Sequence, residues 1–249
     1  MNRLSKFGIS SAGLHIIAMA FMLMDHLWAT LLPGQEWLTC LGRIAFPIFS
    51  FLIVEGYFHT HDFKKYLLRL LIFALISEIP FNLMCGGTFF YPIHQNVIWT
   101  FLLGLLGIHL METVHKKYNV WVYTLVCVLV CMAGLIIGTL CMVDYYGPGV
   151  LMVFVFYFFH DKKWWCLLGQ ILSLYWINVV LLGGLIYTIT LFGVDIEFYQ
   201  QGLALLALIP IWLYSGEKGL HSKFFQYFCY SFYPGHMIIL VLILNFINR

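Results

Sequence analysis

Long apolar runs alternate along the chain with short segments that carry most of its charge. The first run, Leu14–Leu31, is long enough to cross the roughly 30 Å hydrocarbon core of a bilayer as a helix. The pattern predicts an all-α, polytopic transmembrane helical bundle with about nine spans, in a range of about eight to ten. The expected spans lie near residues 11–32, 37–58, 64–84, 95–112, 119–142, 147–160, 164–192, 201–214 and 224–247.

Two of these runs depart from a simple spanning helix. The run from Trp164 to Phe192 is too long for one ordinary span and contains Gly183 and Gly184, so it is a broken helix, a tilted helix, or a span followed by a re-entrant piece. In the run 119–142, Gly134 and Gly138 form a small-xxx-small pair that lets helices approach closely. The sequence has no evident internal repeat, and residues 1–249 are interpreted as one membrane domain.

The composition supports this interpretation. The chain is 62% hydrophobic and 10% charged, whereas a soluble domain has about 25% charged residues. Its mean hydropathy is +0.91. The sequence contains no basic patch of the kind that binds nucleic acid, so no nucleic-acid partner is expected. We therefore expect a multi-pass membrane protein, with the lipid bilayer as its first partner.

The positive charges predict the direction of each span. Cytoplasmic loops of membrane proteins are enriched in Lys and Arg, so the basic clusters are expected in the cytoplasm. The N-terminus is then cytoplasmic and the C-terminus lies outside. The clusters are Arg3 and Lys6; Lys64, Lys65 and Arg69; Lys116 and Lys117; Lys162 and Lys163; and Lys218 and Lys223.

Ionisable side chains inside apolar spans are costly, and for this reason they usually mark a functional site. By the predicted topology, His15 and Glu55 lie toward the cytoplasmic side, and Asn96, Tyr146 and His236 are further polar candidates. A cluster is expected near the outer leaflet, formed by Asp25, His26, Arg43, Glu78, Asn82 and Asp144.

Charge pairing suggests roles for three of these residues. Arg43 keeps its proton, so inside a membrane it needs a carboxylate, which Asp25 or Glu78 can supply. The pair can equally be a purely structural ion pair. His26 has a near-neutral unperturbed pKa and is the natural general base, oriented by a neighbouring carboxylate.

Several motifs, spread over nearly the whole chain in order, resemble the TraX family. The first is LHIIAMAFMLMDH, which begins at Leu14. The others include GRIAFPIF from Gly42, SEIPFN from Ser77 and FYPGH from Phe232. The resemblance implies an integral membrane acetyltransferase that takes acetyl groups from acetyl-CoA. The named activity of the family is N-terminal acetylation of conjugative pilin.

The family also looks related to the wider transmembrane acyltransferases, which share a basic residue followed eleven positions later by a histidine. Here the histidine is His26, and the basic position is His15, where relatives commonly have Lys or Arg. A neutral His15 cannot neutralise a cofactor phosphate, and Lys6 or Arg69 are the alternatives. The resemblance also implies a location in the bacterial inner (cytoplasmic) membrane. The expected acceptor is membrane-bound or exported, and a pilin, a glycan and a lipid-linked group are the alternatives.

The resemblance and the residues together predict a set of roles. His26 acts as the base, Asp25 or Glu78 orients it, and Arg43 or Asn82 stabilises the developing oxyanion. No protein nucleophile and no metal are predicted. The expected substrate- and cofactor-binding residues are His15, Glu55, Arg69, Asn82, Asn96, Asp144, Tyr146 and His236.

Two other functions fit the same residues. A proton-coupled transporter or permease would use Asp25, Glu78 and Arg43 as an intramembrane relay. A structural assembly factor for a surface appendage would need none of the chemistry of His26. The resemblance favours the hypothesis that the protein transfers an acetyl group to an amine or hydroxyl.

Overall fold

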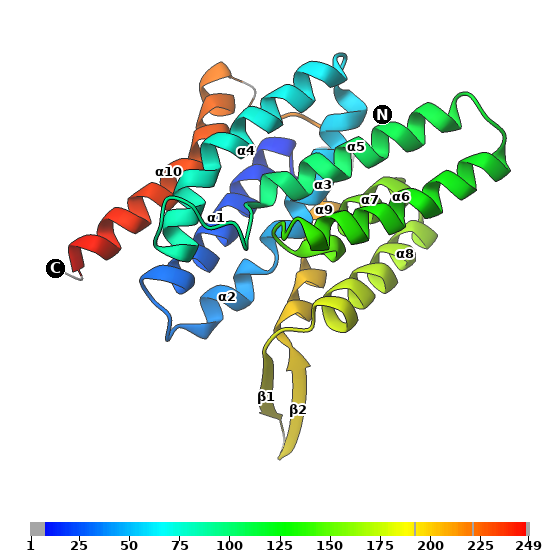
Figure 1. Cartoon of the computed structure of the whole chain (residues 1–249). Helices are drawn as coiled ribbons and strands as arrows, with labels where there is room; N and C mark the ends of the chain where they lie inside the picture. Colours follow the sequence, from blue (N-terminus) through cyan, green and yellow to red (C-terminus); the bar gives the residue numbers. More distant parts are fainter. Residues whose placement is uncertain (1–7, 192, 221, 248–249) are drawn as a thin grey trace.

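Helices make up most of the chain, and a short β-hairpin projects from one end of the bundle (Figure 1). The computed structural model describes residues 8–191, 193–220 and 222–247. The α-helices are α1 Ser11–Thr30, α2 Glu36–Gly42, α3 Ala45–His59, α4 Phe63–Gly86, α5 Val97–His115, α6 Val120–Leu140, α7 Tyr146–Phe158, α8 Trp164–Tyr175, α9 Leu208–Trp212 and α10 Lys223–Ile247. The π-helical segment η2 Trp176–Leu182 continues α8, the 3-10 helix η3 Gln200–Ala207 precedes α9, and the hairpin pairs β1 Ile186–Leu191 with β2 Val194–Tyr199.

Within the described residues, seven helical segments are long and apolar enough to cross a membrane. Two shorter apolar helices, Tyr146–Phe158 and Gln200–Trp212, occupy the places of the remaining predicted spans. Apart from the predicted run 164–192, the boundaries agree with the sequence prediction to within a few residues. The predicted all-α polytopic bundle is therefore confirmed, and the protein is a multi-pass membrane protein. The seven longer segments are Ser11–Thr30, Glu36–His59, Phe63–Gly86, Val97–His115, Val120–Leu140, Trp164–Leu182 and Lys223–Ile247.

Polar residues at the ends of the apolar runs start several helices. The side chain of Ser10 accepts a hydrogen bond from the backbone of Gly13 at the start of α1. Asp62, Asn96 and Asn119 cap α4, α5 and α6 in the same way. Such caps satisfy backbone N–H groups that have no partner inside the helix. The helix starts are therefore determined locally.

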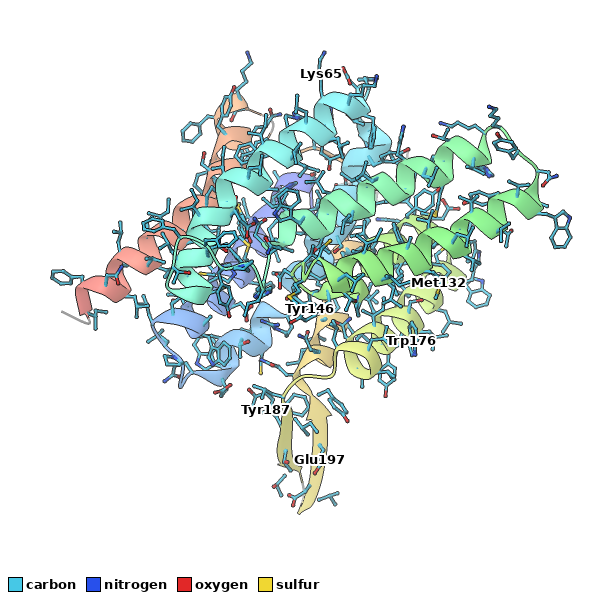
Figure 2. The ribbon with its side chains drawn as sticks, viewed as in Figure 1. Lys65, Met132, Tyr146, Trp176, Tyr187 and Glu197 are labelled. Carbon is cyan, nitrogen blue, oxygen red and sulfur yellow. The ribbon has the colours of Figure 1, made fainter. Side chains whose placement is uncertain are left out.

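The connecting segments gather at two opposite ends of the bundle. At one end, the backbone of Ile9 pairs with Leu213 and Ser215, and Ser11 pairs with Glu217. We call this the basic end, because Lys65 also lies there, opposite Tyr187 and Glu197 on the hairpin (Figure 2). We call the opposite end the hairpin end. The cytoplasmic placement of the basic end stays a prediction, and Arg3 and Lys6 lie outside the described residues.

The run 164–192 resolves into a helix followed by a β-hairpin, and the strands are not predicted by the sequence pattern. Gly183 and Gly184 have φ angles of 65° and 95°, which favour glycine, and they end the helix. The antiparallel register then pairs Ile186 with Tyr199 and Thr188 with Glu197. The broken-helix alternative is thus the closest of the three, although the second piece is extended rather than helical.

Helix α7 lies in the middle of the bundle and is buried along most of its length, whereas α6 lies on the outside of the bundle (Figure 1). Only 6% of the most apolar stretch of α6 is buried against the rest of the protein. Its glycines make the contact between the two helices. A Cβ atom on Gly138 would lie 2.9 Å from Cα of Gly147, so larger residues at this crossing would force the helices apart. The predicted close approach at Gly134 and Gly138 is confirmed.

Candidate functional site

His26 and His236 form a partly buried pair at the hairpin end, between α1 and α10. His26 Nδ1 and His236 Nε2 are 2.6 Å apart. The two rings are nearly coplanar, with an interplanar angle of 15° and a centroid distance of 4.9 Å. The ring of Tyr233 lies 6.4 Å from that of His26. The sequence predicts a carboxylate beside His26, but its hydrogen-bonded partner is a second histidine.

Asp25 and Arg43 form an ion pair that joins α1 to the end of α2. Only 14% of the Arg43 side chain and 20% of the Asp25 side chain are exposed. Thr39 Oγ1 donates to Asp25 Oδ1 at 2.7 Å, and Gln200 Nε2 donates to Thr39 Oγ1 at 2.9 Å. A Cβ atom on Gly42 would lie 2.7 Å from Asp25 Oδ1, so the pair also depends on a glycine. Of the two predicted partners, Arg43 pairs with Asp25.

Glu78 holds a separate polar group between α4 and α5. Its Oε2 accepts hydrogen bonds from the side-chain amide of Asn96 and from Trp99 Nε1, the latter at 2.9 Å. Asn82, one turn further along α4, donates to the carbonyl of Phe89 at 3.2 Å. Glu78 Oε1 and Asn82 Oδ1 are buried and have no hydrogen-bond partner within the described part of the chain. These two oxygens are therefore open to N–H or O–H donors.

Asp144 pairs with a histidine that the sequence analysis does not select. His94 Nε2 lies 3.3 Å from Asp144 Oδ1, and this contact joins the loop before α5 to the turn before α7. Thr100 Oγ1 donates to the Asp144 carbonyl at 2.6 Å. Tyr146 is exposed, and its ring centroid lies 6.5 Å from that of His94. The predicted outer cluster thus divides into several separate polar pairs.

We expect the His94–Asp144 contact to weaken as the pH rises. The hydrogen bond that His94 donates to Asp144 raises the pKa of His94 above 6.5, against the opposing effect of burial. Protonated His94 stabilises the folded state through this contact. The stabilisation is fully present below about pH 6.5, the ordinary pKa of histidine, and it is lost as the pH rises through the higher pKa of His94 in the folded state. The thermal midpoint in detergent should therefore fall by more in the wild type than in His94→Gln as the pH rises from about 6 to about 8, a window that contains the ordinary histidine pKa of about 6.5 and extends above it. Equal falls in both proteins would contradict this assignment.

A half-open cavity of about 460 Å³ lies among α1, α3, α4, α5 and α10 and extends from the basic end toward the His26–His236 pair. Its wall includes successive turns of α1 at Ser11, His15, Met19 and Met22. Met22 stands four residues before His26, on nearly the same face of the helix. The cavity therefore ends one helical turn below the histidine pair. Its other lining residues include Glu55, His59, Arg69, Phe101, Lys218 and Tyr233.

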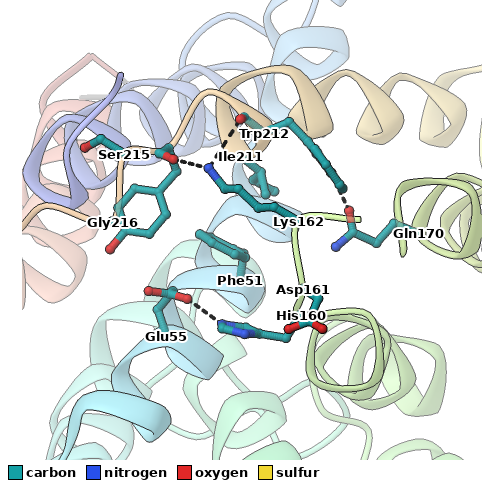
Figure 3. Close-up of a pocket in the computed structure, with 11 residues that line it drawn as sticks. Phe51, Glu55, His160, Asp161, Lys162, Gln170, Ile211, Trp212, Ser215 and Gly216 are labelled. Atoms are coloured by element: carbon teal, nitrogen blue, oxygen red, sulfur yellow. Dashed lines mark hydrogen bonds and ion pairs between the residues drawn. The ribbon is translucent and has the colours of Figure 1, made fainter. Parts of the chain in front are cut away.

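A second cavity, of about 350 Å³, lies beside the first at the basic end (Figure 3). His160 Nε2 and Glu55 Oε1 are 2.5 Å apart on its wall. Lys162 donates to the carbonyls of Trp212 and Tyr214, which ties the turn after α7 to the end of α9. Burial lowers the pKa of Lys162. Glu55 and Tyr214 line both cavities, so they form part of the wall between them.

The predicted site residues therefore fall into two regions. His15, Glu55 and Arg69 line the first cavity, of about 460 Å³, and the other nine lie beyond it, toward the hairpin end. His15 Nδ1 hydrogen-bonds to the Ser11 carbonyl at 2.8 Å. The sequence analysis does not select the partners of several of these residues. His94, Trp99, His160, Lys218 and Tyr233 become visible as site residues only when distant segments are brought together.

The geometry defines a class of protein: a multi-pass helical membrane protein with partly buried polar pairs at one end and a half-open cavity that leads toward them from the other. The chain matches the family described as "TraX protein" over residues 10–244, and it belongs to that family. The predicted family resemblance is thus confirmed.

One curated relative shares part of this sequence. The chain is 33% identical over 110 residues to "Probable fimbrial assembly protein FimC, serogroup H1" of Dichelobacter nodosus. That match covers 40% of this chain and 45% of the relative, so it spans less than half the length of either protein. No solved structure matches the chain.

Proposed function

We propose that this protein transfers an acetyl group from acetyl-CoA to an amine or hydroxyl of a membrane-bound or exported acceptor, with His26 as the general base. The observation that carries the proposal is the position of the cavity. It begins among cationic residues at the basic end and ends at Met22 and Tyr233, one turn below His26 and His236. A donor entering from the basic end would bring its acyl group toward the histidine pair.

The lining of the cavity suits an acyl-CoA. Arg69 and Lys218 supply permanent positive charge for phosphates, and His15 and His59 add groups that can be protonated. Arg69 therefore offers the charge that His15 lacks at the position where relatives have Lys or Arg. The walls beyond this rim are aromatic and aliphatic, as expected for a site that binds the uncharged arm of a cofactor.

The reaction needs no covalent intermediate with the protein. The acceptor nitrogen or oxygen attacks the thioester carbonyl, the new C–N or C–O bond forms, and the C–S bond breaks. His26 takes the proton of the attacking group and returns it to the departing thiolate of CoA. Asp25 and Arg43 neutralise each other, and in this proposal they hold α1 and α2 in place around the base instead of contacting the substrate.

The acceptor would bind on the hairpin side of His26. The unpartnered oxygens of Glu78 and Asn82 lie one turn apart on α4 and can accept hydrogen bonds from its N–H or O–H groups. The N-terminus of a pilin is a candidate acceptor, because N-terminal pilin acetylation is the named activity of the family and the Dichelobacter nodosus relative is named as a fimbrial assembly protein. A glycan or a lipid-linked group has the same donor chemistry.

Purified protein in proteoliposomes tests the proposal. The vesicles would be loaded with membrane extract from a host strain lacking this protein, as the acceptor source, and supplied externally with radiolabelled acetyl-CoA. We expect acetyl label to enter extract components only when the protein is present. Flux of a solute in sealed vesicles without acyl-CoA, together with no acetyl transfer, would instead support the transporter.

A further inference from the structure

The hydrogen bonds of His236 determine where its proton lies. His236 Nδ1 is 2.6 Å from the backbone carbonyl of Phe232. A carbonyl oxygen only accepts, so Nδ1 of His236 must carry the hydrogen. A neutral imidazole has one N–H group, which leaves Nε2 of His236 as an acceptor. The hydrogen shared between the two rings therefore belongs to His26 Nδ1.

This assignment leaves one nitrogen of His26 with a lone pair. With its hydrogen on Nδ1, neutral His26 has an unprotonated Nε2, which is the atom able to accept a proton. The near-coplanar rings fit an end-to-end N–H···N bond rather than a face-to-face stack. His236 is only 6% exposed, so water does not easily replace it as the partner of His26.

We propose that His236 is a positioning residue: it holds His26 in the tautomer whose Nε2 is free, and it stabilises the imidazolium that forms when Nε2 takes a proton. This inference rests on the proposed acetyl transfer. During the reaction, the proton moves from the acceptor group to Nε2 of His26 and then to the thiolate of CoA. The Nδ1 hydrogen stays between the two rings throughout, so His236 neither gains nor loses a proton overall.

The pair is well isolated from other charges. Asp25 and Arg43 are the charged groups that act on His26, and they are paired with each other. Tyr233 and Phe232 pack against the His236 ring, with centroid distances of 6.0 and 4.9 Å. No carboxylate is hydrogen-bonded to either imidazole in the described part of the structure. A neutral hydrogen-bond acceptor thus takes the place of the carboxylate that commonly orients a catalytic histidine.

Two substitutions separate positioning from packing. His236→Leu removes the acceptor, whereas His236→Gln keeps a side-chain oxygen that can accept from His26 Nδ1. We expect His236→Leu to lower kcat by about 100-fold, at the low end of general-base effects, with the KM for acetyl-CoA within about 2-fold of wild type. His236→Gln should recover at least about 10-fold of that loss. His109→Leu, at an exposed histidine outside the cavity, is the matched control.

Nitrogen NMR of histidine-labelled protein reads the tautomer directly and does not depend on turnover. We expect His26 to be protonated on Nδ1 in the wild type and to shift toward the Nε2-protonated form in His236→Leu. A wild-type His26 protonated on Nε2, or equal kcat values for His236→Leu and wild type, would overturn the inference. If the expected tautomer is found and the wild type transfers no acetyl group, the proposed function fails while the assignment of the hydrogen stands.

Discussion

Replacing His26 with asparagine should lower the rate of acetyl transfer by about 10²- to 10⁴-fold, the range expected for loss of a general base. An asparagine amide can still donate to His236 from nearly the position of Nδ1, so the link between α1 and α10 is kept. The variant has no group in place of Nε2 that can take a proton. The attacking group would then have to lose its proton to water in a largely apolar setting.

The measurement is the initial rate of acetyl transfer in proteoliposomes, compared at equal amounts of folded protein. His109→Asn makes the same chemical change on the exposed surface of α5 and should keep the wild-type rate. The affinity for acetyl-CoA should change little in His26→Asn, because the cavity ends before His26. A His26→Asn protein with a rate within a few-fold of wild type would remove His26 from the mechanism.

Breaking the Asp25–Arg43 pair should cause the largest loss of stability. Removing one partner of a buried ion pair leaves an uncompensated charge and typically costs about 3–5 kcal/mol. Asp25→Asn should cost more than Arg43→Gln, because a lone Asp25 can neutralise itself by binding a proton and a lone Arg43 cannot lose one. In Asp25→Asn, the Thr39 hydroxyl also loses the charged acceptor to which it donates.

The free energy of unfolding can be measured by SDS titration of protein in mild detergent micelles. The double variant Asp25→Asn/Arg43→Gln completes a thermodynamic cycle and should lose much less than the sum of the two single losses. Glu197→Gln, the same kind of change at an exposed carboxylate on β2, serves as the control. Single losses that simply add would show that Asp25 and Arg43 do not stabilise each other.

The spans were predictable because a membrane imposes a local rule. Each segment must satisfy its own backbone hydrogen bonds and present apolar side chains to lipid, so run length and flanking polar residues are enough to locate it. Asn96 and Asn119 end up as helix caps within three residues of the predicted starts. The β-hairpin was not predicted, because its first strand follows a helix within one apolar run. Composition alone does not distinguish such a strand from a further helical turn.

By itself, the sequence determined the membrane class, the position of nearly every span and the unusual polar residues within them. Tertiary structure decided which of those residues meet. His26 and His236 are 210 residues apart, and Glu55 and His160 are 105 apart, so no local pattern links them. Arg43 needs a carboxylate on physical grounds, but only the packing of α1 against α2 selects Asp25 over Glu78. Burial makes a partner necessary, and the arrangement of the helices determines which residue supplies it.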